Sequence, residues 1–356
     1  MPKYHLNKDN LKMDLELEGH LLYIDITQMC GIGCDFCMYG DKHFVGESLS
    51  LSEKSKSNLA ALINSSDVKR VSISGEGEPL NNLTVFKEIL SLSEGGVDFE
   101  FITSGFLRTE KLFELYESVN EDLSQTGDRC NFRLSSDSHH IEKIANPTQG
   151  ASLDYFFRKS PSNITFSFRS IDTDREFTRQ FLLSQLNKFS RVGEIRALTE
   201  LEDELVVGGS SFRIDYKNLV HPDLTNNNSF LGFYDYIELL EVKSSKKFTF
   251  GSLNKAPLKN GLDLTVKPDG EVYLYGVEHK KLGNIHRDDF SWTQLKQTVQ
   301  KDRELLTLYS VPLLKLLQPF ENHEKVIQAI RRANNPYWLF KSLAQEGLVK
   351  EIMSHD

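Results

Sequence analysis

TQMCGIGCDFCMY, residues 27–39, holds three of the four cysteines of this chain, Cys30, Cys34 and Cys37. Two glycines lie between the first two of these cysteines. Glycine weakens a helix but lets a loop backbone bend through positive φ. The segment therefore predicts a loop after a strand, in which three thiolates surround one metal centre. A [4Fe-4S] cluster has four irons, so three cysteines would leave one iron open to a small ligand.

Two other interpretations of the cysteines stay open. Structural zinc would need a fourth ligand, and His43, six residues after Cys37, is a candidate. A redox-active dithiol at Cys34 and Cys37 is less favoured, because this pair does not open a thioredoxin-like unit. The fourth cysteine, Cys130, begins an expected strand, and we interpret it as a buried core thiol.

The composition is that of a globular protein of 356 residues, with 39% hydrophobic and 26% charged residues. No apolar run reaches the roughly 18 to 20 residues of a membrane span, and residues 1–20 lack the apolar stretch of a secretory signal. We therefore expect a cytoplasmic protein without a membrane partner. In a reducing compartment, clustered cysteines indicate a metal site or catalysis and not a disulfide framework. The net charge of −9 disfavours duplex nucleic acid as a partner.

Short apolar runs typical of strands alternate with amphipathic helical segments from residue 21 to about residue 200. This alternation predicts repeated βα units and a parallel sheet, and so an α/β fold. Five or six such units suit a partial (β/α) barrel or an open doubly wound sheet. The expected strands are 21–27, 68–74, 99–103, 130–136 and 164–170, with a sixth at either 194–198 or 211–215.

The pattern changes after about residue 215. LDLTVKPDGEVYLYG, residues 262–276, alternates with period two around a Pro-Asp-Gly turn, which predicts a β-hairpin. From residue 291 onward the spacing of apolar residues is helical.

The cysteine loop resembles that of the radical S-adenosylmethionine (SAM) superfamily. Cys-x3-Cys-x2-Cys follows the first expected strand, and the aromatic Phe36 precedes the last cysteine. SGEGEPL (74–80), ITSGF (102–106) and RLSSDS (133–138) end the next three strands. They are similar to the Gly-Glu, Thr-Asn-Gly and Ser-x-Asp motifs of that family. All four segments are expected at the carboxyl ends of parallel strands, where barrels and doubly wound sheets bind ligands.

The resemblance covers residues 21–290 and implies a partial (β/α)6 barrel with one [4Fe-4S] cluster on the three cysteines. In the family, the amino and carboxylate groups of SAM chelate the open iron. One electron, from an external donor such as flavodoxin or ferredoxin, then splits the sulfonium into methionine and a 5′-deoxyadenosyl radical. That radical abstracts hydrogen from the substrate.

The resemblance also implies roles for individual residues. Glu78 would accept hydrogen bonds from the SAM ammonium, and Gly75 and Gly77 would let backbone approach it closely. We expect Glu76 to be a turn residue, and Asp137 with His139 and His140 to form a solvated loop in preference to a second metal or acid–base site. The remaining expected cofactor contacts are Ser135 with the methionine carboxylate or ribose, Thr103 or Ser104 with the ribose, Phe36 and Tyr39 with the adenine, and Arg169 with a carboxylate.

The hairpin at 264–285 resembles that of the SPASM and twitch extensions, which usually hold auxiliary clusters. Tyr275 stands where the first auxiliary cysteine is expected, and no cysteine follows residue 130. We therefore expect a small α+β extension without a cluster, and a single iron–sulfur centre in the protein. Tyr273, Tyr275 or His279 could contact substrate, although packing is the commoner role of a tyrosine on a hairpin. The expected parts of the chain are an N-terminal extension (1–20), a radical SAM core (21–220), the hairpin region (221–290) and C-terminal helices (291–356).

The expected substrate is a peptide or a small polar metabolite, and the catalytic residue that would act on it is not indicated by any motif. The alternative from another class is a scaffold protein without catalytic activity, which would use the three cysteines and His43 to hold zinc. A third interpretation is a member of the family that keeps the cluster but regulates a partner, and the intact Glu78 and Ser135 disfavour it.

Overall fold

The computed structural model describes most of the chain, and three residues singled out above, Phe36, Tyr39 and His43, lie outside the described part. The described residues are 20–34, 37, 45–65, 68–217, 232–250, 262–333 and 335–354.

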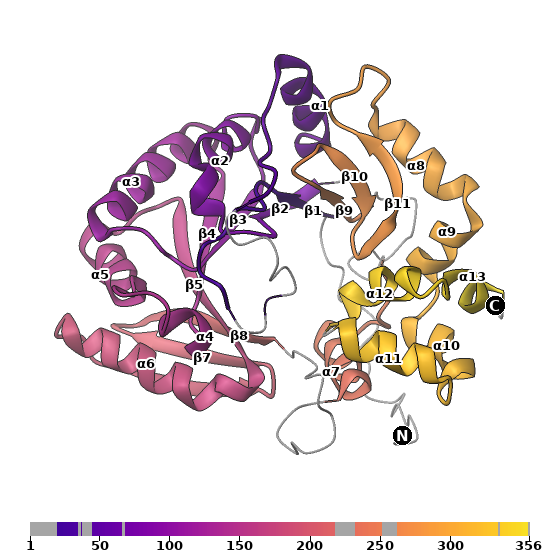
Figure 1. The fold of residues 1–356 in the computed structure, drawn as a ribbon. Helices are drawn as coiled ribbons and strands as arrows, with labels where there is room; N and C mark the ends of the chain where they lie inside the picture. Colours follow the sequence, from indigo (N-terminus) through magenta and orange to yellow (C-terminus); the bar gives the residue numbers. More distant parts are fainter. Residues whose placement is uncertain are drawn as a thin grey trace.

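The described strands form one sheet in the order β11-β10-β9-β1-β2-β3-β4-β5-β8-β7-β6 (Figure 1). Adjacent strands from β1 to β5 pair in parallel, and β8 pairs in parallel with β5. The strands are β1 (His20–Asp25), β2 (Val68–Ser74), β3 (Asp98–Thr103), β4 (Arg129–Ser135), β5 (Ile164–Ile171), β6 (Gly193–Thr199), β7 (Glu202–Val207), β8 (Ser210–Lys217), β9 (Leu264–Val266), β10 (Glu271–Leu274) and β11 (Val277–Asn284).

The predicted α/β class and the five predicted strands are confirmed. Both candidates for the sixth strand are strands, but only the segment at 211–215 joins the parallel part, as β8. The segment at 194–198 lies in β6, which pairs antiparallel with β7 at the end of the sheet. Six parallel strands in chain order agree with the expected βα repeat, and the partial barrel stays a prediction.

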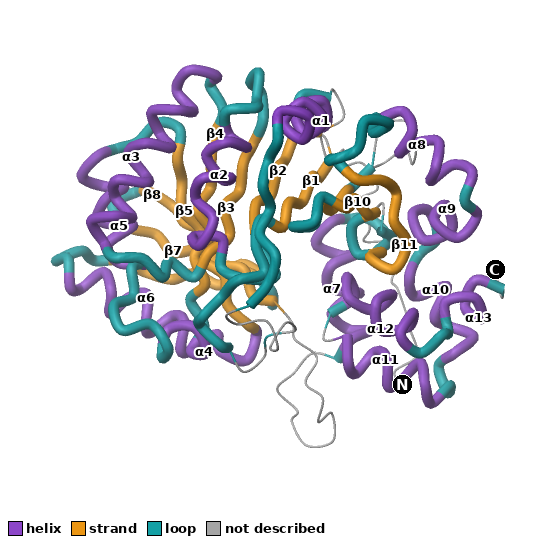
Figure 2. Tube along the Cα trace, turned by 45° about the horizontal axis from the view of Figure 1, so that its top comes forward, coloured by secondary structure: helices purple, strands orange, loops and turns teal. Residues whose placement is uncertain are grey.

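Helices of the first half of the chain lie side by side along one face of the parallel strands, and helices of the C-terminal part gather near β9–β11 (Figures 1 and 2). The helices predicted after residue 291 are confirmed. No helix in the described part is long and apolar enough to cross a membrane. The helices are α1 (Glu53–Ile63), α2 (Leu83–Leu90), α3 (Thr109–Thr126), α4 (Ser138–Ile141), α5 (Gln149–Lys159), α6 (Arg175–Lys188), α7 (Phe233–Ser244), α8 (Trp292–Lys301), α9 (Arg303–Ser310), α10 (Leu313–Leu317), α11 (Glu324–Ala333), α12 (Leu339–Gln345) and α13 (Val349–Met353).

The core lies between the parallel strands and the helices that cover them. Phe86 of α2 packs on Phe101 of β3 with 4.1 Å between ring centroids, and Tyr116 of α3 meets Phe132 of β4 at 4.7 Å. Cys130 lies on the same face of β4 and is fully buried, which confirms that it is a core thiol. Successive side chains of a strand point to opposite faces. The residues that alternate with Phe101 on β3 and with Phe132 on β4 therefore point away from the helices.

The opposite face of these strands is polar, and it ends at the candidate site. Arg133 and Ser135 alternate with buried apolar residues on β4, and Arg169 does so on β5. The strand period of two thus separates an apolar face that holds the fold together from a polar face that is available for chemistry.

The predicted hairpin is confirmed, because β9 and β10 pair antiparallel around residues 267–270. Its first strand, β9, also pairs in parallel with β1, and Leu264 lies opposite Leu22. The hairpin therefore extends the main sheet and brings its residues beside the carboxyl end of β1. The likeness to a SPASM or twitch extension and the four expected chain limits stay predictions.

Candidate functional site

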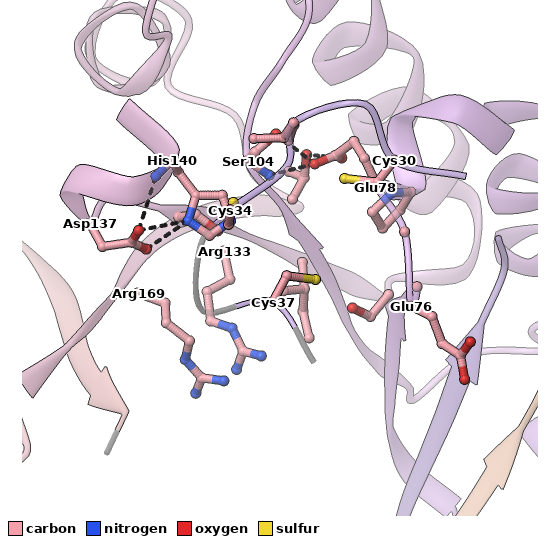
Figure 3. A pocket seen from close by; sticks show the side chains of 18 of the residues that line it. Cys30, Cys34, Cys37, Glu76, Glu78, Ser104, Arg133, Asp137, His140 and Arg169 are labelled. Carbon is pink, nitrogen blue, oxygen red and sulfur yellow. Dashed lines mark hydrogen bonds and ion pairs between the residues drawn. The ribbon is translucent and has the colours of Figure 1, made fainter. Parts of the chain in front are cut away.

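A cavity of about 240 Å³ lies at the carboxyl ends of the parallel strands (Figure 3). It is lined by the loop after β1, the loop after β2 and the ends of β3, β4, β5 and β8. The structure brings ten of the twelve predicted site residues to this cavity: Cys30, Cys34, Cys37, Gly75, Gly77, Glu78, Thr103, Ser104, Ser135 and Arg169.

The cysteine loop is fixed by the Gly-Glu loop after β2. The backbone N–H of Gly77 donates to the carbonyl of Thr27 at 2.9 Å, and that of Glu78 donates to Met29 at 2.8 Å. A Cβ atom at Gly77 would lie 2.1 Å from the Met29 carbonyl oxygen, and one at Gly75 would lie 2.5 Å from that of Thr27. The glycines are thus required by the close approach of the cysteine loop, a reason that their sequence motif did not indicate.

The three thiols surround the cavity without meeting at one point. Cys30, Cys34 and Cys37 are half-buried, and the backbone N–H of Cys37 donates to the Cys34 carbonyl at 3.0 Å. Among the described residues, no three Cys, His, Asp or Glu side chains are close enough to hold a single metal ion. Gly31 and Gly33 have φ of 119° and 69°, as the loop interpretation expects. Burial raises the pKa of the Cys30 thiol, and Glu78 adds to this effect.

Glu78 is buried and accepts four hydrogen bonds from the surrounding chain. Its Oε1 accepts from the backbone N–H of Leu80 at 3.1 Å and from the hydroxyl of Thr103 at 2.5 Å. Its Oε2 accepts from the backbone N–H of Ser104 at 2.8 Å and from the Ser104 hydroxyl at 2.6 Å. Two oxygens offer about four acceptor positions, so Glu78 is fully occupied and joins the loop after β2 to the end of β3.

Ser135 and Arg169 line the cavity from neighbouring strands. Ser135 ends β4, and its carbonyl accepts a hydrogen bond from Gln149 at 2.6 Å. Arg169 lies opposite Ser135 in the β4–β5 register, and its Nη2 is 3.0 Å from a carboxylate oxygen of Asp215 on β8. The guanidinium is therefore oriented by a partner on the next strand.

The expectation of a solvated loop at Asp137 is wrong. Asp137 is 3% exposed and caps helix α4, where its carboxylate accepts from the His140 backbone N–H at 3.1 Å and lies 2.8 Å from the His140 ring Nδ1. Burial by itself lowers the pKa of His140, but hydrogen bonds to Asp137 and Cys34 outweigh it and raise the pKa to about 10. Asp137 thus orients a cationic imidazole toward the cysteine loop (Figure 3).

A buried ionic cluster that no sequence motif indicated lies beside the cavity. Lys267, which follows β9, lies 2.8 Å from Asp25, 3.2 Å from Glu76 and 2.7 Å from Glu278. Glu76 lies in a bend, as expected, but it is 8% exposed and also accepts from Gln28 at 2.9 Å, so it is more than a turn residue. The only signal in the sequence is that Asp25 and Lys267 interrupt apolar strand patterns.

Asp25 gives this cluster a defined dependence on pH. Burial raises its pKa from 3.8 to about 6, and Glu278 and Glu76 add to the rise while Lys267 opposes it. The folded chain therefore holds the Asp25 proton more tightly than the unfolded chain does. This stabilisation is present below about pH 4 and is lost as the pH rises through about 6.

We expect Asp25→Asn to remove this dependence, because asparagine resembles the protonated acid. In urea unfolding between pH 4 and pH 7, the wild-type free energy of unfolding should fall relative to that of the variant. A difference between the two proteins that stays constant over this range would contradict the assignment.

No protein-family model and no curated protein matches this sequence. Among solved structures, the chain is similar to "Native anSMEcpe with bound AdoMet", with 15% identity and a TM-score of 0.47 over 94% of this chain and 100% of that chain. The structure of anSMEcpe with AdoMet and the Cp18Cys peptide gives 15% identity and a TM-score of 0.47, over 95% and 99% of the two chains. BtrN in complex with AdoMet and 2-DOIA gives 12% identity and a TM-score of 0.36, over 82% and 85%.

Proposed function

We propose that this protein is a radical SAM enzyme, which binds one [4Fe-4S] cluster through Cys30, Cys34 and Cys37 and cleaves SAM reductively. One observation carries the proposal: the three thiols, the Gly-Glu loop and the ends of β3 and β4 line one cavity. These segments are separate in the sequence, and the fold gathers them at the carboxyl ends of parallel strands, where such sheets bind ligands.

The residues present fit a cluster better than a single zinc ion. A structural zinc site needs four ligands, whereas the three thiols that line the cavity match a [4Fe-4S] cluster with one iron left open to SAM. Two basic side chains also face the loop, since His140 bonds to Cys34 and Lys143 donates to the carbonyl of Gly33. Positive groups beside the loop suit the negative charge of a cluster held by thiolates.

When bound, the cluster would supply the electron that splits SAM into methionine and a 5′-deoxyadenosyl radical, which abstracts hydrogen from the substrate. The chain itself would bind and orient SAM. Glu78 can accept from the SAM ammonium only if a hydroxyl of Thr103 or Ser104 gives up its bond to this carboxylate. Such an exchange would free the hydroxyl for the ribose, so that both predicted roles are met by one rearrangement.

The substrate is proposed to be a peptide or a small polar metabolite, and the electron to come from an external carrier such as flavodoxin or ferredoxin. Neither proposal needs a second cluster. The described residues contain one further cysteine, Cys130, and it is buried in the core on the face away from the cavity.

Anaerobic reconstitution with iron and sulfide tests the proposal. We expect about four irons per chain, the content of one [4Fe-4S] cluster, and release of 5′-deoxyadenosine after SAM and dithionite are added. About eight irons per chain would contradict a single cluster. One tightly bound zinc, no iron and intact SAM would instead establish the scaffold alternative.

A further inference from the structure

A second cavity, of about 330 Å³, adjoins the candidate site on the polar face of the sheet. We call it the basic cavity. Five residues line both cavities, namely Tyr23, Arg133, Arg169, Lys217 and Trp338. Three of these five are basic and none is acidic, so the wall that the two cavities share carries positive charge.

The strand pattern places these cations on one face. Arg133 of β4 and Arg169 of β5 alternate with buried apolar residues, and Lys217 ends β8 opposite Ile171 of β5. Figure 3 shows the guanidinium groups of Arg133 and Arg169 extending in the same direction, away from Asp137. Three neighbouring strands thus each contribute one cation at the same end of the sheet.

Carboxylates in the described part of the chain balance the positive charge of these three side chains only in part. Arg133 lies 2.8 Å from Glu100, and Arg169 lies 3.0 Å from Asp215. The Nε atoms of both arginines are nevertheless buried without a hydrogen-bond partner among the described residues, and Arg133 is only 9% exposed. A buried N–H donor without an acceptor is costly, and an anion in the cavity would supply the acceptor.

Lys217 has no ion pair with a carboxylate of the described residues, although it lies beside the two arginines. Burial, with Arg169 and Arg133 acting in the same direction and Cys37 opposing them, lowers its pKa to about 7. The three side chains have two carboxylate partners between them, and the remaining positive charge costs free energy, which a bound carboxylate or phosphate would recover.

Aromatic rings form the adjoining wall of the basic cavity. The rings of Tyr23 and Tyr275 are 5.4 Å apart, and those of Tyr275 and Tyr337 are 5.0 Å apart, so the three tyrosines are contiguous. Trp338 lines both cavities. Such walls bind flat or ring-shaped groups, and a volume of about 330 Å³ is at the small-molecule end of ligand cavities.

We propose that the basic cavity binds the substrate as a small organic anion, with its carboxylate or phosphate on Arg133, Arg169 and Lys217 and its ring against the tyrosines. That the bound anion is a substrate rests on the proposed function. The inference narrows the expected substrate class from a peptide or small polar metabolite to an anionic small molecule.

Isothermal titration of the reconstituted protein tests the charge preference. The probes are phenyl phosphate and benzoate, with benzyl alcohol as the uncharged ring and inorganic phosphate as the anion without a ring. We expect one of the two aromatic anions to bind at least about tenfold more tightly than either partial probe, since charge-assisted hydrogen bonds and ring contacts both contribute. The stronger of the two anions identifies the carboxylate or the phosphate class. Equal affinity for benzyl alcohol would overturn the proposal.

Two variants test the residues. Lys217→Gln breaks no ion pair with a described carboxylate, and Arg133→Lys retains a charge for Glu100 but lacks the Nε donor. Each should weaken binding of the aromatic anion by about tenfold. Arg196→Gln, an exposed arginine on β6 paired with Glu194, is the matched control and should leave binding unchanged. Unchanged affinity in both cavity variants would overturn the proposal.

A titration in the presence of saturating SAM separates this role from recognition of SAM itself. We expect the aromatic anion and SAM to bind together. Competition between them would mean that the cations hold the SAM carboxylate, and would overturn the proposal. The anion preference is also measured without SAM and on the protein before reconstitution, so failure of iron loading or SAM cleavage would count against the proposed function and not against this site.

Discussion

Replacement of Cys34 by alanine is expected to abolish both iron binding and the release of 5′-deoxyadenosine. Each of the three thiolates would hold one iron of the cluster, so loss of one leaves two irons without protein ligands. Because the cofactor supplies the chemistry, we expect SAM cleavage to fall by at least about a thousandfold.

The fourth cysteine provides the matched control. Cys130→Ala removes a thiol from the core face of β4, where the residue is fully buried. The small cavity that it leaves should cost about 1 kcal/mol of folding free energy, with iron content and SAM cleavage unchanged. A Cys34→Ala protein that keeps about four irons and full activity would refute the assignment of the cysteines. Zinc content that falls with Cys34→Ala in a protein without iron would support the scaffold alternative.

Much of the fold follows from local pattern. The runs at 99–103, 130–136 and 164–170 are strands because their apolar residues recur with period two, and helices between them enforce parallel pairing. The sixth parallel strand could not be chosen from sequence, because 194–198 and 211–215 both have strand character. Their difference lies in pairing, since β6 and β7 form an antiparallel excursion before β8 returns to β5.

The site was predictable where chemistry depends on residues that are close in the sequence. The cysteine spacing and the Gly-Glu segment are of this kind, and the structure places both at one cavity. The ionic cluster is different, because Asp25 and Lys267 are 242 residues apart and meet only through the pairing of β1 with β9. Arg133 and Lys217 were also missed, since no motif marks an isolated cation on the polar face of a strand.

The structural importance of the ionic cluster leads to the largest expected effect on stability. Lys267 is 7% exposed and bonds to carboxylates from β1, the loop after β2 and β11. Lys267→Met would leave Asp25, Glu76 and Glu278 buried together without their common cation. Removal of one partner from a buried ionic group costs about 3 to 5 kcal/mol, and we expect a loss of this size in urea unfolding at pH 7.5.

The sign of the pH dependence distinguishes this electrostatic cause from a loss of packing. Without Lys267, the three carboxylates keep only Lys341, 3.7 Å from Glu278, as a cationic partner, and they bind protons more tightly in the folded chain. The penalty in Lys267→Met should therefore shrink as the pH falls toward 5. A second substitution, Asp25→Asn, should recover part of the loss at pH 7.5 because it removes one of the repelling charges. Lys281→Met, at an exposed lysine on neighbouring β11 paired with Glu271, should cost less than about 1 kcal/mol.

A loss of stability in Lys267→Met that does not vary with pH, or that Asp25→Asn does not reduce, would mean that Lys267 acts through packing against Trp338, whose ring lies 5.7 Å from its Nζ.

A pH-dependent loss of stability would instead make Lys267 the electrostatic link between the C-terminal hairpin and the site. Two of its carboxylate partners lie close to the cysteines in the fold. Asp25 ends the strand before the cysteine loop, and Glu76 lies in the Gly-Glu loop, whose backbone holds the cysteine loop in place. Iron loading of Lys267→Met should then fall together with its stability, although Lys267 contacts none of the three cysteines in a hydrogen bond or ion pair described here.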